Sequence, residues 1–166
     1  MQLITGGLGF IGNELARQLV REQSVAILDN HHRVAPRIDD LGHLTVHDVD
    51  ITDAAAVSRV LEAVRPRVVF HLAAVHYIPE CNADPERTLR VNVEGTLAVL
   101  NACAAARVEH LIVASSGAVY ADAADPLKES SPVAPVDVYG WSKSFAESIC
   151  RWHSSQTGMP VTICRL

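Results

Sequence analysis

A glycine-rich turn near the N-terminus, set between a short apolar run and a helical segment, constrains the fold of this chain more than any other feature. Residues 2–5 are the apolar run, glycines follow at positions 6, 9 and 12, and residues 9–21 have a helical pattern. Glycines leave room for a close ligand, and the free N–H groups and dipole of a helix N-terminus attract a pyrophosphate. A second predicted strand, 24–29, ends on Asp29, where a carboxylate can hydrogen-bond the ribose hydroxyls of NAD. This order of features predicts a dinucleotide-binding unit.

Strand-like and helix-like segments alternate along the rest of the chain. The predicted strands are residues 2–5, 24–29, 44–47, 67–72, 110–115 and 161–164, and the predicted helices are 9–21, 53–64, 85–107 and 138–157. Several strands are continuous apolar runs, such as Val68-Val69-Phe70, which is typical of a parallel sheet covered on both faces. We therefore predict an α/β fold, a doubly wound parallel sheet of the Rossmann type, in one domain over residues 1–166.

Composition argues against several classes of protein. With 166 residues, 49% hydrophobic and 20% charged, the chain suits one globular domain with a sizeable core. A net charge of −5 without a Lys/Arg run argues against a nucleic-acid or membrane partner, and no apolar stretch is long enough to span a bilayer. The four cysteines form no Cys-x-x-Cys pair, so we expect free thiols in a reducing cytoplasm.

Tyr139 and Lys143 stand four residues apart in the predicted helix 138–157, so their side chains share one face. A tyrosine is a poor base at its reference pKa of about 10, but a neighbouring ammonium and the positive nicotinamide of NAD⁺ favour the phenolate. We expect Tyr139 to take a proton from a substrate hydroxyl as hydride leaves the same carbon. Ser116 follows a predicted strand end, where ligands sit in open α/β sheets, and is expected to hold the hydroxyl oxygen. Tyr-x-x-x-Lys also arises by chance in helices, so the argument depends on its combination with the glycine turn and Asp29.

Motifs along nearly the whole chain resemble the extended short-chain dehydrogenase/reductase family, which includes NAD-dependent sugar-nucleotide epimerases and dehydratases. They are Thr5-Gly6-Gly7-x-Gly9-x-x-Gly12, Leu28-Asp29-Asn30, Asp50-Ile51-Thr52-Asp53, His71-Leu72-Ala73-Ala74, Asn92-Val93-Glu94-Gly95-Thr96, Ser115-Ser116-Gly117-Ala118-Val119-Tyr120 and Tyr139-x-x-x-Lys143. The resemblance implies NAD as the cofactor and a nucleotide-diphosphate sugar as the substrate.

The resemblance also implies a role for each matching residue. The pyrophosphate would be held by Gly6, Gly9, Phe10, Ile11 and Gly12, the adenosine ribose by Asp29 and Asn30, the adenine by Asp50 and Ile51, and the nicotinamide side by Leu72, Ala73 and Ala74. Ser116, Tyr139 and Lys143 would be the catalytic residues, with Lys143 also holding the nicotinamide ribose.

Two departures from the family pattern refine the expected function. The family's 4,6-dehydratases usually place Asp-Glu after the Ser/Thr, whereas Gly117-Ala118 follows here, which favours an epimerase. Family members usually run to about twice this length, and their C-terminal half supplies the substrate domain, so we expect that domain to be absent from these residues. Two alternatives stay open: a dehydrogenase or reductase acting on another alcohol, and an NAD-binding module without catalysis.

Histidines and arginines outside the motifs allow weaker hypotheses. His76 follows a predicted strand near the expected meeting point of nicotinamide and substrate, and it is a candidate substrate contact or a loop residue satisfied by backbone. His31, His32, His43 and His47 lie close in sequence, but no Cys or acid stands at ligand spacing, so we predict no metal. Arg33 and Arg37 suit a 2′-phosphate, but the Asp29 carboxylate repels one, which favours NAD over NADP.

Trp141, Phe145, Ile149 and Trp152 form a stripe along the predicted helix 138–157. Trp141 lies two residues after Tyr139, about 200° around the helix, so the stripe faces away from the catalytic pair. Core packing is the first interpretation. Because family members often dimerise by pairing this helix and the preceding long one into a four-helix bundle, a homodimer interface is the alternative.

Overall fold

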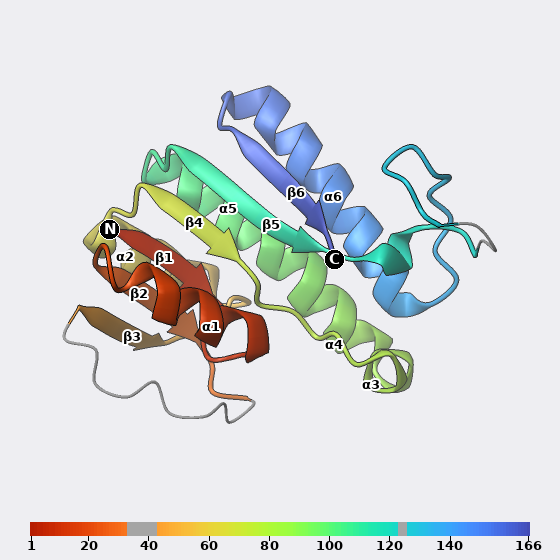
Figure 1. Cartoon of the computed structure of the whole chain (residues 1–166), viewed down its shortest axis with the longest axis horizontal. Helices are drawn as coiled ribbons and strands as arrows, with labels where there is room; N and C mark the ends of the chain where they lie inside the picture. Colours follow the sequence, from red (N-terminus) through yellow and green to blue (C-terminus); the bar gives the residue numbers. More distant parts are fainter. Residues whose placement is uncertain (33–42, 123–125) are drawn as a thin grey trace.

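The parallel sheet predicted from the sequence is present in the computed structural model, which describes residues 1–32, 43–122 and 126–166. Within these residues six parallel strands lie in the order β3-β2-β1-β4-β5-β6 (Figure 1). Their bounds are β1 Gln2–Thr5, β2 Val25–Asp29, β3 Leu44–Asp48, β4 Val68–His71, β5 His110–Ser115 and β6 Val161–Arg165. The strand order reverses between β1 and β4, and this switch point is where doubly wound sheets bind ligands.

The helices agree with the prediction at both ends of the chain and differ in the middle. The helical segments are α1 Phe10–Leu19, α2 Ala54–Val64, α3 Ile78–Ala83, α4 Pro85–Leu89, the π-helix η1 Arg90–Gly95, α5 Thr96–Ala105, the 3₁₀-helix η2 Gly117–Val119 and α6 Val138–Thr157. The single helix predicted over 85–107 is thus divided by a π-helical turn, and the short α3 and η2 were not predicted.

Aspartate caps begin three of these helices. The carboxylates of Asp53, Asp84 and Asp137 accept hydrogen bonds from backbone N–H groups in the first turns of α2, α4 and α6. At its other end α6 stops at Gly158, whose φ of 73° is left-handed. These start and stop signals explain why the bounds of α6 were predictable.

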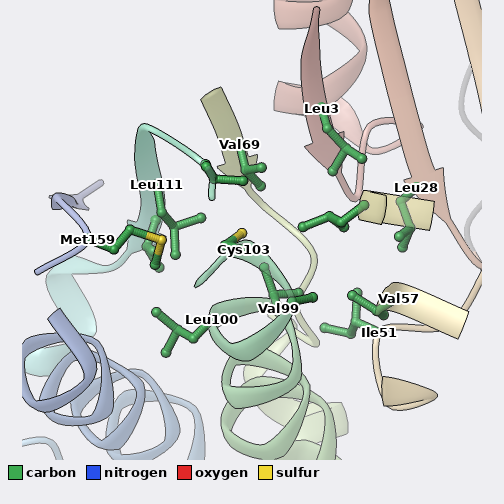
Figure 2. Close-up of a cluster of buried hydrophobic side chains, with 14 of the residues drawn as sticks. Leu3, Leu28, Ile51, Val57, Val69, Val99, Leu100, Cys103, Leu111 and Met159 are labelled. Atoms are coloured by element: carbon green, nitrogen blue, oxygen red, sulfur yellow. The ribbon is translucent and has the colours of Figure 1, made fainter. Parts of the chain in front are cut away.

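The main core lies between the sheet and the layer of α2, α5 and α6 (Figure 1). Its buried side chains come from alternate positions of β1, β2, β4 and β5 and from the inner faces of α2 and α5. Figure 2 shows the cluster with Leu3, Val69 and Leu111 above the α5 residues Val99 and Cys103. This packing fixes the sheet against the helices that carry the site residues.

The opposite face of the sheet is only partly covered. Helix α1 packs there over β1 and β2, around a smaller cluster that includes Ile4, Ala16 and Ile27. Among the described residues no helix lies over the same face of β4, β5 and β6 (Figure 1). Phe70 and Ile112 are therefore half-buried at positions where a parallel sheet is usually covered.

The aromatic stripe of α6 is not part of the core, contrary to the first interpretation. The side chains of Trp141, Phe145 and Trp152 are 47%, 47% and 58% exposed, and only Ile149 packs against the core. The helix buries its opposite face, with Ser142, Lys143, Ala146, Glu147 and Cys150, so the aromatic residues point to solvent. The prediction that the stripe faces away from Tyr139 and Lys143 agrees with this arrangement.

Candidate cofactor and catalytic site

The glycine turn lies at the switch point and brings its backbone against the end of β4. Gly6 has a φ of 67°, and a Cβ at this position would lie 2.7 Å from the backbone N of Ala73. A Cβ at Gly12 would lie 2.7 Å from the Cα of Gly7, so a side chain there would not fit either. Gly9 begins α1 by accepting a hydrogen bond from the N–H of Asn13. The turn therefore exposes a backbone surface into which a pyrophosphate fits.

Asp29 at the end of β2 is held by two backbone N–H groups. Its carboxylate oxygens accept hydrogen bonds from Leu8 in the glycine turn at 3.0 Å and from His31 at 2.9 Å. These bonds fix the acid beside the turn, as expected for a ribose-binding carboxylate.

Asp50 and Asn30 come from neighbouring loops and bind each other. The Asn30 amide donates to Asp50 at 2.8 Å, and the N–H and hydroxyl of Thr52 donate to the same carboxylate. Burial alone would raise the pKa of Asp50, but the hydrogen bonds from Thr52 and Asn30 lower it below its ordinary value. An ionised Asp50 beside the buried Ile51 suits the amino edge of an adenine.

All of the predicted site residues line one cavity of about 430 Å³. They are Gly6, Gly9, Phe10, Ile11, Gly12, Asp29, Asn30, Asp50, Ile51, Leu72, Ala73, Ala74, His76, Ser116, Tyr139 and Lys143. The structure thus brings together residues from β1, β2, β4, β5 and α6 that are far apart in the sequence. Phe10 is 95% exposed at the start of α1, so its ring is free to lie against a bound molecule.

Ser116, Tyr139 and Lys143 meet at the end of this cavity where β5 and α6 come together. The Ser116 Oγ accepts a hydrogen bond from the N–H of Ala118, which caps η2. Lys143 is only 7% exposed, and burial lowers the pKa of its ammonium to about 8. Near pH 7 most Lys143 side chains are therefore still charged.

The pKa of Tyr139 differs from the expectation. Burial raises it above the ordinary value, and the opposing effect comes from a hydrogen bond with Ser116 rather than from the Lys143 ammonium. In the protein alone Tyr139 is therefore a protonated phenol. A positive charge that arrives with a ligand would favour its phenolate.

A buried histidine behind the cavity was missed as a site residue. The hydroxyl of Thr96 donates to the carbonyl of Asn92 at 2.7 Å, so its oxygen accepts from His71 Nε2 at 2.9 Å. His71 Nδ1 then accepts from the Thr5 hydroxyl at 2.7 Å, and Thr5 accepts from the N–H of Ala73. This series of hydrogen bonds fixes one tautomer of His71 and connects β1, β4 and α5 at the switch point.

Asn92 in η1 holds the loop after β4; the sequence placed it in a family motif but gave it no role. Its amide oxygen accepts from the N–H of Val75, and its amide nitrogen donates to the Val75 carbonyl and to the Ser142 hydroxyl. Ser142 in turn donates to the carbonyl of Tyr139. The π-helical turn therefore connects the loop lining the cavity to the backbone of Tyr139.

Charged residues at the rim of the cavity were also missed. Arg87 of α4 pairs with Glu80 of α3 and lies 2.9 Å from the Nε2 of His32. Among the described residues no three His, Cys, Asp or Glu side chains are placed to hold a metal ion. Arg33 and Arg37 lie outside the described residues.

The fold and the site together define a Rossmann-type dinucleotide-binding domain with a Ser, Tyr and Lys group in its cavity. A model of the family described as "NAD dependent epimerase/dehydratase family" matches residues 2–166, and the chain belongs to this family. This confirms the family resemblance and the fold class. NAD is the cofactor that the family uses, as the sequence predicted.

Curated relatives and solved structures agree with this assignment. A UDP-glucose 4-epimerase of Lactobacillus helveticus is 33% identical over 98% of this chain and 50% of its own length. UDP-arabinose 4-epimerase 1 of Arabidopsis thaliana is 35% identical over 98% of this chain and 41% of its own. The crystal structure of Thermus thermophilus UDP-glucose 4-epimerase in complex with NAD has a TM-score of 0.92 and 32% identity, over 99% of this chain and 54% of that one. The chain spans about half the length of the curated relatives it matches.

Among the described residues no helix is long and apolar enough to cross a membrane.

Proposed function

We propose that this chain is the cofactor-binding and catalytic part of an NAD-dependent sugar-nucleotide epimerase. The observation that carries the proposal is that Ser116, Tyr139 and Lys143 line the same cavity as the glycine turn and Asp29. A glycine turn packed so closely against Ala73 that a Cβ at Gly6 would not fit, next to a fixed carboxylate, fits a dinucleotide. Bound NAD supplies a reversible hydride acceptor.

Each of the three residues has a distinct task in this proposal. Tyr139 removes the proton from a sugar hydroxyl and gives it back. Ser116, already hydrogen-bonded to Tyr139, holds the oxygen of that hydroxyl. Lys143 is buried and still mostly charged near pH 7, so it stabilises the phenolate once the site is occupied.

The nucleotide sugar and the outcome of the reaction are argued from two sources. The relatives named above are 4-epimerases of UDP-sugars, which favours a nucleotide-diphosphate sugar here. Gly117 and Ala118 follow Ser116 in η2 and offer no acid or base for a dehydration. His76 lines the cavity and is exposed, so it is a candidate substrate contact.

We further propose that a substrate domain completes this site in the natural protein. The chain matches only about half of each relative's length. The half-bare face of β4, β5 and β6 is a surface that further chain would cover (Figure 1). Residues 1–166 would then be the NAD-binding Rossmann domain with the catalytic Ser, Tyr and Lys.

A homodimer through α5 and α6 is part of the same proposal. The exposed Trp141, Phe145 and Trp152 place apolar surface along α6, where a second copy would cover it.

All four cysteines are free thiols, and Cys81, Cys103 and Cys150 are buried, which suits a reducing compartment such as the cytoplasm.

Replacing Tyr139 with Phe tests the proposed chemistry. We expect epimerisation of a UDP-sugar to slow by roughly 10²–10⁴-fold, because proton transfer is lost, while NAD affinity measured by calorimetry changes little. Tyr77→Phe is the control, because Tyr77 is 57% exposed and does not line the cavity.

The same assay separates the alternatives. Net accumulation of NADH would identify a dehydrogenase or reductase. NAD binding with no turnover of any sugar nucleotide, and no effect of Tyr139→Phe, would identify a binding module instead.

A further inference from the structure

Glu147 is a buried carboxylate one helical turn beyond Lys143 on α6. It is 2% exposed, and it accepts four hydrogen bonds of 2.6 to 2.8 Å. The donors are the Ser115 hydroxyl, the Arg151 guanidinium and two nitrogens of the Arg165 guanidinium. A buried charge is costly unless it is fully bonded, so this site is built around an ionised Glu147.

The bonds of Glu147 join three elements that meet at the catalytic group. Ser115 is the last residue of β5 and immediately precedes Ser116. Arg165 is the last residue of β6 and also lies over the ring of Tyr120, 4.7 Å from its centroid. Glu147 itself lies on the helix of Tyr139 and Lys143. One carboxylate therefore fixes the strand end before Ser116 relative to that helix.

We propose that Glu147 is a positioning residue of the catalytic site, which holds Ser116 against Tyr139 and keeps Lys143 in its charged form. The proposal rests on the proposed function for the reaction itself. Its electrostatic part concerns the protein alone and can be measured without substrate.

The charges around Lys143 support the electrostatic part. The titratable groups that interact electrostatically with Lys143 are His71 of β4, which is held neutral, and Cys150 and Glu147 on its own helix. Burial lowers the pKa of Lys143, and Cys150 and the negative charge of Glu147 raise it again. The Glu147 carboxyl has a pKa of about 2, because hydrogen bonds from Arg165, Ser115 and Arg151 outweigh its burial, so it stays ionised near pH 7. Without that charge Lys143 would lose its proton at a lower pH.

The pH at which Lys143 loses its proton can be measured directly, because the chain contains two lysines, Lys128 and Lys143. Lysine labelled with ¹³C at Cε gives one NMR signal for each, and the exposed Lys128 serves as the internal reference. The signals are assigned with Lys128→Arg. The variant is Glu147→Gln, which keeps the size of the side chain and removes its charge.

Glu109→Gln is the matched control, because Glu109 also pairs with an arginine, Arg67, but is 64% exposed. We expect the titration midpoint of Lys143 to move to lower pH by roughly one pH unit in Glu147→Gln and to stay in place in Glu109→Gln. An unchanged midpoint in Glu147→Gln would overturn the proposal.

Kinetics test the positioning part. In Glu147→Gln we expect kcat for a UDP-sugar to fall on the order of tenfold to a hundredfold with little change in KM, and the alkaline limb of the pH profile to move to lower pH. A lower Tm with an unchanged kcat and pH profile would show a merely structural role and refute the proposal. If wild type turns over no sugar nucleotide, the proposed function fails while the NMR titration still decides the role of Glu147's charge.

Ser115→Ala provides a second variant in case Glu147→Gln does not fold. It removes one donor to the carboxylate and leaves both arginine pairs in place. We expect a fall in kcat without a change in KM, because Ser116 loses its anchor. Unchanged kinetics in Ser115→Ala would contradict the positioning of Ser116 by Glu147.

Discussion

Gly6 and Gly158 share a left-handed backbone, with φ of 67° and 73°, but differ in their surroundings. A Cβ at Gly6 would lie 2.7 Å from the backbone of Ala73, whereas nothing lies within 4 Å of a Cβ at Gly158. A side chain at Gly158 would thus carry only the conformational cost of the left-handed backbone, whereas one at Gly6 would add a clash with the backbone of Ala73.

Alanine at the two glycines should give different results. For Gly158→Ala we expect a loss of about 1–2 kcal/mol in the free energy of unfolding and unchanged NAD affinity. For Gly6→Ala we expect a larger loss and strongly weakened NAD binding, because the turn must move away from β4. Urea unfolding and calorimetry measure both, and equal effects in the two variants would contradict the close approach of Gly6 to Ala73.

His71 is fully buried and neutral, and burial lowers its pKa from 6.5 to about 3. Between these pH values the unfolded chain binds a proton that the folded protein does not, so stability must fall as the pH falls below 6.5. Glu147 adds to this loss only below pH 4.5, the upper end of its own titration. The range from pH 6.5 to 4.5 therefore reports on the buried histidines, which are His71 and also His153, whose pKa burial lowers as well.

His71→Gln should flatten this pH dependence. We expect wild type to lose a few kcal/mol of unfolding free energy over that range and the variant to lose much less, although the variant is less stable at pH 7. Urea midpoints at a series of pH values provide the measurement. His43→Gln, at an exposed position before β3, is the control and should keep the wild-type slope.

At the scale of elements, the π-helical turn η1 has a structural role that could not be inferred from its sequence. In this π-helical turn the buried amide of Asn92 accepts a hydrogen bond from the N–H of Val75 and donates one to its carbonyl. Gly95 in the same turn packs against Ile51, where a Cβ would lie 2.7 Å from the Ile51 side chain. An α-helix through these residues would rotate Asn92 away from Val75.

Asn92→Ala should expose the importance of this turn. The variant leaves the buried N–H and carbonyl of Val75 without partners, so we expect a loss of about 3 kcal/mol in unfolding free energy and weaker NAD binding. Asn101→Ala on the exposed face of α5 should have almost no effect. Similar unfolding curves for the two variants would show that Asn92 is dispensable.

Strands and long helices were predictable because their signals are local. The apolar runs of β1 and β5 and the capped ends of α6 fix these elements within the sequence itself. The π-helical turn was not predictable, since it depends on Val75 and Ile51, which contact it from other parts of the fold. The six-residue α3 is too short for helical periodicity to show.

The residues of the candidate site can also be divided into those suggested by local sequence motifs and those whose roles depend on the fold. Residues inside motifs, such as Tyr139 and Asp29, could be proposed because their spacing suggests the chemistry, and the structure places them in one cavity. His71 and Glu147 were not given roles, since their importance comes from burial and from partners distant in sequence. The exposure of Trp152 was misjudged because an apolar stripe on a helix looks the same whether it faces a core or a partner.

At the scale of the molecule, the α6 stripe predicts the oligomeric state. We expect a dimer at micromolar concentration in sedimentation velocity, and monomers for Phe145→Ser combined with Trp152→Ser, because apolar area is removed from the interface. Val46→Ser is the control, since Val46 has a similar exposure of 42% but lies on β3 at the far edge of the sheet. A monomeric wild type would refute the proposed interface.

The half-bare sheet face of β4, β5 and β6 also has a calorimetric consequence. Side chains such as Phe70 and Ile112 already contact water in the folded state, so unfolding exposes less new apolar surface than in a sheet covered on both sides. Because newly exposed apolar surface sets the heat-capacity change of unfolding, residues 1–166 produced on their own should have a smaller heat-capacity change per residue than a fully covered Rossmann domain. Their stability curve should accordingly be broad and shallow, with a weak dependence on temperature.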